Sequence, residues 1–282
     1  MILVKKVSDL KDLLKHEKSK SLQTGFVPTM GALHDGHLSL LSQSVKENQK
    51  TVCSIFINPT QFNDVKDFEK YPVTIEQDIV MLEKNGCDIL FLPSVQEMYP
   101  DGLTSSVHYD LGFLETILEG KYRPGHFQGV CQVMHHLLDM VQPDNLYMGR
   151  KDYQQCMVVD RLIKLTGLKT RLHPCPTLRE ADGLAMSSRN LRLQADDRQK
   201  ASTLFKALSY LKDQLKPGSM EGIRKEAMAK LDAKGFKTDY LAIADAKTLE
   251  PADHWDGSQN LVALVAAVIN DIRLIDNMLI TG

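Results

Sequence analysis

The chain has 282 residues, of which 43% are hydrophobic and 25% charged, and its formal net charge is −2. This composition is typical of a globular protein, and the length allows one large or two modest domains. Because the charge is nearly balanced, no global field favours nucleic acid or an anionic membrane, and we expect neither as a partner.

The sequence predicts a cytoplasmic protein with reduced cysteines. Residues 1–6 lack the long apolar stretch of a signal peptide, and the longest apolar run, 261–269, is too short to span a bilayer. The five cysteines are scattered and form no CxxC pair. We expect them to be small buried side chains rather than disulfides or zinc ligands.

From residue 24 to residue 175, short apolar runs alternate with longer helical periods. This alternation predicts parallel strands joined by right-handed crossovers, hence a Rossmann-like, doubly wound α/β domain. Gly86 and Gly167 follow the last periodic residues of two helices, where helix-ending glycines belong. Strands are expected at 24–27, 52–57, 88–92, 146–148 and 170–173, and helices at 36–47, 73–85, 127–141 and 153–166.

A smaller α+β domain is expected after a polar, loop-like stretch at 176–193. We place the two domains at 1–178 and 179–282. Pro217-Gly218 separates two helical patterns, as a turn does. In this domain helices are expected at 196–215 and 220–234, and strands at 238–244, 261–269 and 272–279.

The stretch 26–38 combines an apolar strand, a turn and two histidines that bracket Gly36 at a helix start. The first N–H groups of a helix are unpaired and its dipole favours negative charge, so His34 and His37 can converge on one anion. A solvated or buried structural pair is the alternative, and zinc is disfavoured because no further ligand lies at a suitable spacing. Since the Walker P-loop and GxGxxG patterns are absent, any use of ATP depends on this element.

Polar segments follow four of the predicted strands, at the edge where ligands bind in open α/β sheets. Lys151, between a strand and a helix, suits a phosphate contact better than a surface position. Gln61 and Gln155 carry amides that suit the hydroxyl and carboxylate groups of a small polar substrate, unless they are simply exposed. The segments are 29–37, 58–62, 149–152 with 154–155, and 176–180 with 186–190.

Two further segments have a structural and a functional interpretation. Residues 186–189 (Met-Ser-Ser-Arg) form either an ordinary loop or a mobile clamp whose hydroxyls and guanidinium close over phosphates. Residues 123–127 (Arg-Pro-Gly-His-Phe) form either a turn before a helix or a wall of the substrate pocket.

Several motifs together identify a family. The sequences PTMGALHDGHLSL, INPTQF, YRPGHFQGV, GRKDYQQ and READGLAMSSRN occur in order along the chain. With them the chain resembles the pantoate–β-alanine ligases, within the nucleotidyl-transfer superfamily that shares an HxGH element. The resemblance covers essentially the whole chain. It implies an ATP-dependent ligase that condenses (R)-pantoate with β-alanine through a pantoyl adenylate, releasing AMP and pyrophosphate.

The resemblance also implies partners and roles. It implies a homodimer, Mg²⁺ that arrives with ATP, a domain at 1–178 that binds ATP and pantoate, and a lid at 179–282. His37, as proton donor, and His34, Lys151 and Arg189 are the implied catalytic residues; Gln61 and Gln155 are the implied pantoate contacts. ATP contacts are implied at Met30, Gly31, Ala32, Leu33, His34, Asp35, Gly36, His37, Gly149, Arg150, Lys151, Asp152, Leu178, Met186, Ser187, Ser188 and Arg189.

Two departures from the family pattern are visible. Arg150 stands where Glu is more usual, which adds positive charge beside the phosphates, and Leu178 stands where Val is common. Because histidine titrates near neutrality, the charge of His34 and His37 stays open.

Other functions are weaker alternatives. A different adenylyltransferase of the superfamily would not be expected to carry INPTQF and GRKDYQQ together. A class I aminoacyl-tRNA synthetase would carry a KMSKS loop, whereas Ala185 replaces its first lysine here. A catalytically silent module that binds a nucleotide or RNA is disfavoured by the intact set of polar segments at strand ends.

Overall fold

The structure, a computed structural model, describes residues 1–18, 21–103 and 107–281. Contacts between Cα atoms divide it into two compact units. Unit 1 consists of Met1–Arg150 and Gln154–Pro176, and unit 2 of Lys151–Tyr153 and Thr177–Gly282. The roles expected for 1–178 and 179–282, as substrate-binding domain and lid, stay a prediction.

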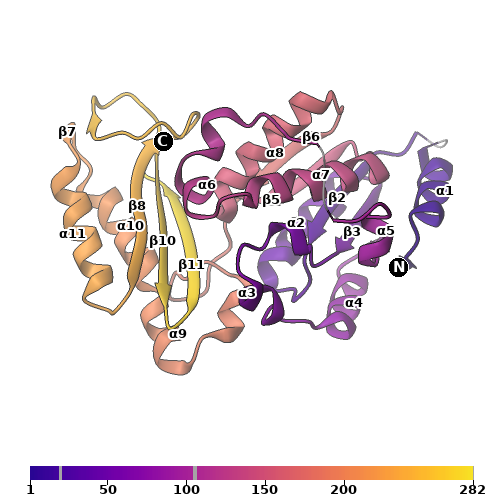
Figure 1. The fold of residues 1–282 in the computed structure, drawn as a ribbon, viewed down its shortest axis with the longest axis horizontal. Helices are drawn as coiled ribbons and strands as arrows, with labels where there is room; N and C mark the ends of the chain where they lie inside the picture. The colour runs from indigo at the N-terminus through magenta and orange to yellow at the C-terminus, as the bar shows by residue number, and fades with distance from the viewer. Residues whose placement is uncertain (19–20, 104–106, 282) are drawn as a thin grey trace. The chain divides into compact units, whose positions relative to one another are not determined.

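Unit 1 is built on a parallel sheet, and the predicted doubly wound α/β fold is confirmed. Six strands of the described chain lie in the order β1-β4-β3-β2-β5-β6, and every pairing is parallel. The chain runs from β2 through β3 to β4 and then returns to β5 on the other side of β2. The strand order therefore reverses between the neighbours β2 and β5, which is where ligands bind in such folds. The strands are β1 (Ile2–Val4), β2 (Thr24–Thr29), β3 (Lys50–Ile55), β4 (Ile89–Phe91), β5 (Asn145–Gly149) and β6 (Arg171–Cys175) (Figure 1).

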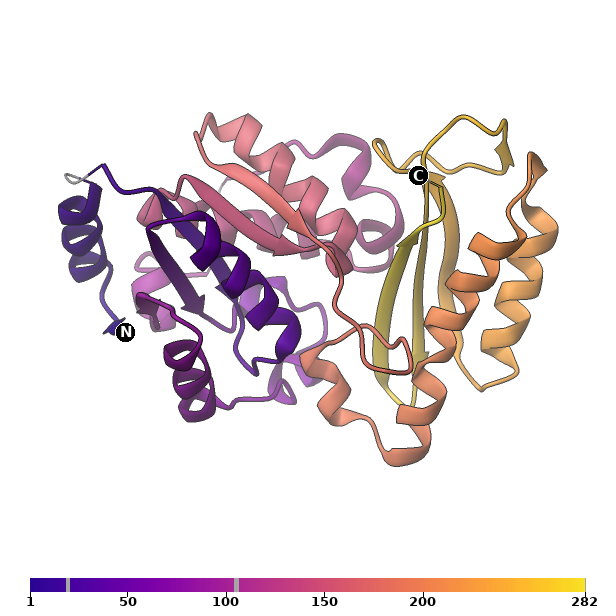
Figure 2. The ribbon, with the colours of Figure 1, turned by 180° about the vertical axis from the view of Figure 1, so that it is seen from behind.

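Helices bury both faces of this sheet. Neighbouring residues of a strand point to opposite faces and therefore pack against different helices. Phe26 packs in one apolar cluster with side chains of α1, α7 and α8, and Val27 in another with side chains of α2 and α4. Seen from behind, α2 lies in front of the sheet (Figure 2). The longer helices are α1 (Val7–Lys18), α2 (Asp35–Glu47), α4 (Ile75–Lys84), α7 (His126–Val141) and α8 (Tyr153–Thr166).

The elements predicted for this part are present, with ends moved by a few residues. Gly86 and Gly167 adopt φ of 82° and 69° just after α4 and α8, which confirms them as helix-ending residues. The prediction missed β1 and α1, and it missed several short helices. These are α3 (Val65–Glu69), α5 (Val95–Met98), α6 (Leu118–Tyr122), and the 3-10 turns η1 (Pro59–Gln61), η2 (Gly112–Glu115) and η3 (Arg150–Asp152).

Unit 2 contains an antiparallel sheet in the order β11-β10-β8 with α10 and α11 packed against it (Figure 1). The predicted α+β architecture of this part is confirmed. The core joins apolar residues from both helices to alternate residues of the sheet. The elements are η4 (Ser188–Arg192), α9 (Ala195–Ala201), α10 (Thr203–Gln214), β7 (Gly218–Ser219), α11 (Glu221–Asp232), β8 (Lys237–Asp245), β9 (His254–Trp255), β10 (Leu261–Ile269) and β11 (Ile272–Leu279).

The single helix expected at 196–215 is wrong. The chain forms α9 and α10 with Ser202 between them. The Ser202 hydroxyl donates a hydrogen bond to the carbonyl of Gln199 at 3.2 Å, and such local bonds compete with the helical ladder. The apolar period continues across the break, so the pattern alone does not reveal it.

Candidate active site

The histidine element begins where β2 ends, at the carboxyl edge of the sheet. Gly31 and Ala32 turn the chain with φ of 80° and 49°. His34 then takes an extended conformation, with φ of −144°, as the N-cap of α2. The strand and the turn thus deliver both histidines to the N-terminus of α2, where backbone N–H groups and the helix dipole favour an anion.

The two imidazoles cap the helix reciprocally. His34 Nδ1 accepts a hydrogen bond from the N–H of Gly36 at 3.1 Å, and His37 Nδ1 accepts one from the N–H of His34 at 3.4 Å. Their ring centroids lie 4.1 Å apart. This is the geometry of a capping box with imidazoles in place of the usual hydroxyl and carboxylate. Because Nδ1 of each ring accepts, hydrogen-bond donation from either imidazole goes through Nε2.

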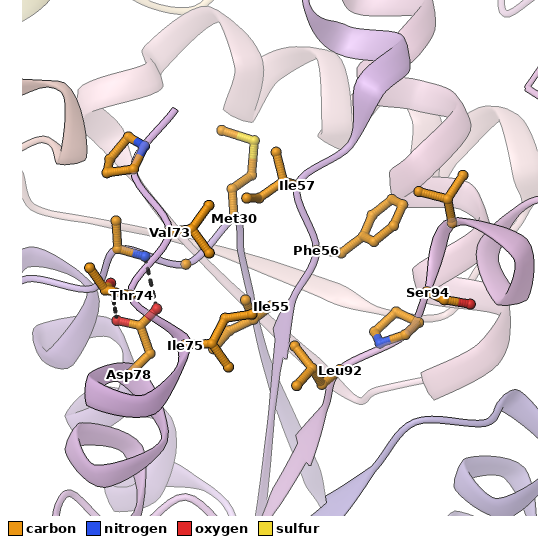
Figure 3. A pocket seen from close by; sticks show the side chains of 15 residues that line it. Met30, Ile55, Phe56, Ile57, Val73, Thr74, Ile75, Asp78, Leu92 and Ser94 are labelled. Carbon is orange, nitrogen blue, oxygen red and sulfur yellow. Dashed lines mark hydrogen bonds between the residues drawn. The ribbon is translucent and has the colours of Figure 1, made fainter. Parts of the chain in front are cut away.

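Asp78 holds the turn that precedes the histidines. Its carboxylate accepts hydrogen bonds from the N–H groups of Ala32 and Leu33, both at 2.9 Å, and from the Thr74 hydroxyl at 3.0 Å. The side chain is buried and forms part of the wall of a cavity of about 240 Å³ beside the turn (Figure 3). A buried carboxylate bonded to successive backbone N–H groups fixes a conformation that a residue with a side chain, such as Ala32, adopts rarely.

Asp78 is not among the site residues predicted from the sequence. It shares the buried face of α4 with Leu82, where a carboxylate is out of place without buried partners. That acidic residue on an apolar helix face is the signal that could have identified it.

Gln61 lies in η1, after the end of β3. Its Nε2 donates to the sulfur of Met30 at 2.8 Å, so two of the predicted site residues contact each other. Asn58 caps the turn: its Oδ1 accepts a hydrogen bond from the N–H of Thr60 at 3.3 Å. The same oxygen accepts a hydrogen bond from the hydroxyl of the buried Tyr99 at 2.8 Å. The local sequence therefore forms a rigid turn, and the adjoining segments determine where Gln61 lies.

The backbone of Gln61 is anchored by residues 123–127. The sequence allowed two interpretations of this segment, a turn before a helix or a wall of the substrate pocket. His126 Nδ1 lies 2.8 Å from the Gln61 carbonyl oxygen, and Arg123 donates to the same oxygen at 3.4 Å. Behind them, a Cβ on Gly129 of α7 would lie 2.2 Å from the carbonyl oxygen of Thr60. Residues 123–129 thus form a support for the turn that carries Gln61.

Gln155 and its neighbour Gln154, both in α8, differ in their burial. Gln154 is buried, and its amide bonds the N–H of Glu119 and the carbonyls of Leu114 and Ile117. Gln155 is half-buried. The structure gives Gln154 a structural role, and Gln155 stays the predicted substrate contact.

Other predicted residues belong to unit 2. Lys151 lies in η3 with its Nζ 3.6 Å from Asp152 Oδ2, and its side chain is 17% exposed. Ser187 accepts from the N–H of Arg189 at 3.3 Å and so caps η4, while Leu178 is exposed. The predicted residues divide between the units: 30–37, Gln61, Gly149, Arg150 and Gln155 lie in unit 1, and Lys151, Asp152, Leu178 and 186–189 in unit 2.

The cysteines fit their prediction as small buried side chains. All are free, and four of the five are buried. Burial raises the pKa of the Cys87 and Cys131 thiols to about 12, so neither is a thiolate at neutral pH. Among residues 1–18, 21–103 and 107–281, no three His, Cys, Asp or Glu side chains gather as a metal site would need. In the same ranges no helix combines the length and apolar character needed to cross a membrane.

Known proteins resemble this chain over its whole length. The model of the family "Pantoate-beta-alanine ligase" matches residues 2–279. The pantothenate synthetase of Bacteroides thetaiotaomicron is 41% identical over 99% of this chain and 98% of its own. That of Caldicellulosiruptor saccharolyticus is 42% identical over 99% of both chains.

Solved structures agree. The pantothenate synthetase of Thermus thermophilus has a TM-score of 0.91 at 40% identity and covers 100% of both chains. The pantoate-beta-alanine ligase of Francisella tularensis, complexed with "Beta-gamma ATP" and beta-alanine, has a TM-score of 0.85 at 36% identity over 100% of this chain and 99% of that one. With the histidine cap and the Gln61 turn at the carboxyl edge of the sheet, these matches establish that the chain belongs to the pantoate-beta-alanine ligase family.

Proposed function

We propose that this chain condenses pantoate with β-alanine at the expense of ATP, through the residues described above. The observation that carries the site assignment is the pair of imidazoles capping α2, in a chain whose family has this activity. A carboxylate does not acylate an amine at neutral pH, because an oxide is a poor leaving group. Adenylation supplies AMP as a better one and divides the reaction into two easier steps.

In the first step a carboxylate oxygen of pantoate attacks the α-phosphorus of ATP, and the bond to pyrophosphate breaks. Negative charge develops on the phosphates, so preorganised donors supply most of the acceleration. We assign this role to the Nε2 donors of His34 and His37, to Lys151, and to the 186–189 segment. His37 is the proposed proton donor.

In the second step the amine of β-alanine attacks the acyl carbon, the bond to AMP breaks, and the amine loses a proton. Gln61 and Gln155 are the proposed pantoate contacts, since their neutral amides can bind its hydroxyl and carboxylate groups. Anchoring by His126 and Arg123 supports this role for Gln61, because a substrate contact must be held in place.

Mg²⁺ is proposed to accompany the nucleotide. The proposed contacts are mostly N–H donors and cations, which suits an ion held chiefly by phosphate oxygens. When bound, the ion neutralises charge on the phosphates. From the family resemblance we also propose a homodimer, a cytoplasmic location and a lid at 179–282. Light scattering coupled to size exclusion tests the dimer.

The decisive experiment is ATP–pyrophosphate exchange with a panel of carboxylic acids, followed by addition of amines. Exchange that requires pantoate, with product only after β-alanine is added, is the expected result. Exchange with a different acid alone, or none with any acid, contradicts the proposal. Retention of RNA by the purified protein, with a high ratio of absorbance at 260 nm to 280 nm, would favour the binding-module alternative.

A further inference from the structure

We propose that Asp276 and Asn277, adjacent residues of β11, are positioning residues that hold both ATP-contacting segments of unit 2. This inference rests on the proposed function, since it concerns Lys151 and residues 186–189 as contacts of ATP. Two sets of hydrogen bonds lead to it, one to Arg179 and one to Lys151.

Asp276 fixes Arg179 to the outer edge of β11. Arg179 donates to Asp276 Oδ2 at 2.7 Å and to Oδ1 at 3.0 Å, and to the carbonyl of Asn277 at 3.0 Å. The Asp276 side chain is only 2% exposed. The guanidinium also lies 4.8 Å from the ring centroid of Phe205. A bidentate pair of this kind sets both the position and the plane of the guanidinium.

Arg179 belongs to a tight hairpin that leads into the 186–189 segment. Arg179 and Ala185 form an antiparallel bridge, and Arg179 also donates to the carbonyl of Gly183 at 3.0 Å. The N–H of Met186 donates to the carbonyl of Leu178 at 3.1 Å. Leu178 and Met186 therefore lie opposite each other, next to the residue that Asp276 holds. The Asp276–Arg179 pair thus determines where the segment with Ser187, Ser188 and Arg189 begins.

Asn277 holds the other segment. Its Nδ2 donates to the backbone carbonyl of Lys151 at 2.7 Å, and the Asn277 side chain is buried. Tyr153, two residues along, donates its hydroxyl to the carbonyl of Ala246 at 2.6 Å. These bonds attach 151–153 to unit 2, although β5 and most of α8 belong to unit 1. Lys151 is thereby held by the same strand as the hairpin.

The arrangement matters because the proposed contacts act by electrostatics. A displacement of about 1 Å in a positioning group can cost about 100-fold in rate. Two neighbouring residues of one strand hold both cationic segments. The geometry of the two segments toward each other is therefore set by covalent structure and by partly buried hydrogen bonds.

A double-mutant cycle in the pyrophosphate-exchange assay tests the inference. Asn277→Asp keeps the shape of the side chain but replaces the Nδ2 donor with an oxygen, which cannot donate to the Lys151 carbonyl. It is expected to lower kcat/KM for ATP about tenfold and to leave KM for pantoate unchanged. In a Lys151→Ala background, Asn277→Asp is expected to have no further effect on kcat/KM, because it acts through Lys151. Asn260→Asp, at an exposed position, is the matched control and should behave as wild type.

The role of the Asp276–Arg179 pair is tested by a second double-mutant cycle, with Arg179→Lys and Arg189→Ala. The losses of kcat/KM for ATP are expected to be non-additive. The unfolding midpoint of every variant is measured as well, to show that the variant is folded. If Asn277→Asp does not fold, Asn277→Ser, which removes the amide without adding charge, replaces it under the same criterion. Additive losses, or wild-type kcat/KM for ATP in Asn277→Asp, would overturn the inference while leaving the proposed function in place. Absence of pantoate-dependent exchange in the wild type would instead refute the proposed function.

Discussion

His37 Nδ1 accepts the backbone N–H of His34, the residue that caps the helix, and the two ring centroids lie 4.1 Å apart. Protonation of either ring at Nδ1 would direct a hydrogen at an N–H donor and break the cap. With Nδ1 accepting in both rings, hydrogen-bond donation from either imidazole goes through Nε2.

The first prediction separates helix capping from catalysis. Serine is a preferred N-cap residue, so His34→Ser keeps the cap of α2 but removes the imidazole donor. We expect pantoate-dependent ATP–pyrophosphate exchange to fall at least about 100-fold in His34→Ser and in His37→Ala, as for the loss of a donor to a developing charge.

The control for both variants is thermal unfolding, which should change little for His34→Ser. His34→Ala, which loses the cap as well, should be destabilised by about 1 kcal/mol. Near-normal exchange by a folded His37→Ala protein would rule out its role in adenylation.

The second prediction concerns the carboxylate behind the turn. Asp78→Asn places an NH₂ group against a backbone N–H, so one of the hydrogen bonds to Ala32 or Leu33 is lost. Leaving a buried donor unpaired costs about 1–3 kcal/mol. We expect a lower free energy of unfolding and a loss of kcat in the exchange reaction. Glu76→Gln, an exposed change in the same helix, should alter neither; equal behaviour of the two variants would contradict the role of Asp78.

The third prediction uses two helical glycines. A Cβ at Gly129 would lie 2.2 Å from the Thr60 carbonyl oxygen, so Gly129→Ala must displace the turn that carries Gln61. We expect KM for pantoate to rise and stability to fall. Gly222→Ala is the matched control, because a Cβ there meets no atom within 4 Å. It should raise stability by up to about 1 kcal/mol without changing KM. A Gly129→Ala enzyme with unchanged KM for pantoate would show that the turn tolerates the displacement.

The fourth prediction distinguishes the two substrates. Gln61→Ala and Gln155→Ala are expected to weaken pantoate binding more than ATP binding, because the amides are assigned to the hydroxy acid. Gln154→Ala should instead lower stability, since its amide bonds three backbone groups of 114–119. Dissociation constants for pantoate and ATP, measured separately by calorimetry, check this. Equal losses of affinity for both ligands in Gln61→Ala would argue against its assignment.

Local patterns in the sequence predicted most of the architecture of unit 1, but not β1 or α1. Apolar strands, helical periods and the glycines after α4 and α8 depend on neighbouring residues, and they predicted the parallel sheet. The break at Ser202 and the short β1 escaped prediction, since one lies within an unbroken apolar period and the other is a strand of three residues.

The sequence by itself also determined which chemical groups the chain offers: two histidines at a helix start, amides after a strand, and a lysine, two serines and an arginine in polar segments. Only the tertiary structure decided how these groups are held. Asp78 is 46 positions from Ala32, and Asn277 is 126 positions from Lys151. The reason is physical: a hydrogen bond between distant segments depends on where the packed core places both partners, and a local pattern carries no record of that placement.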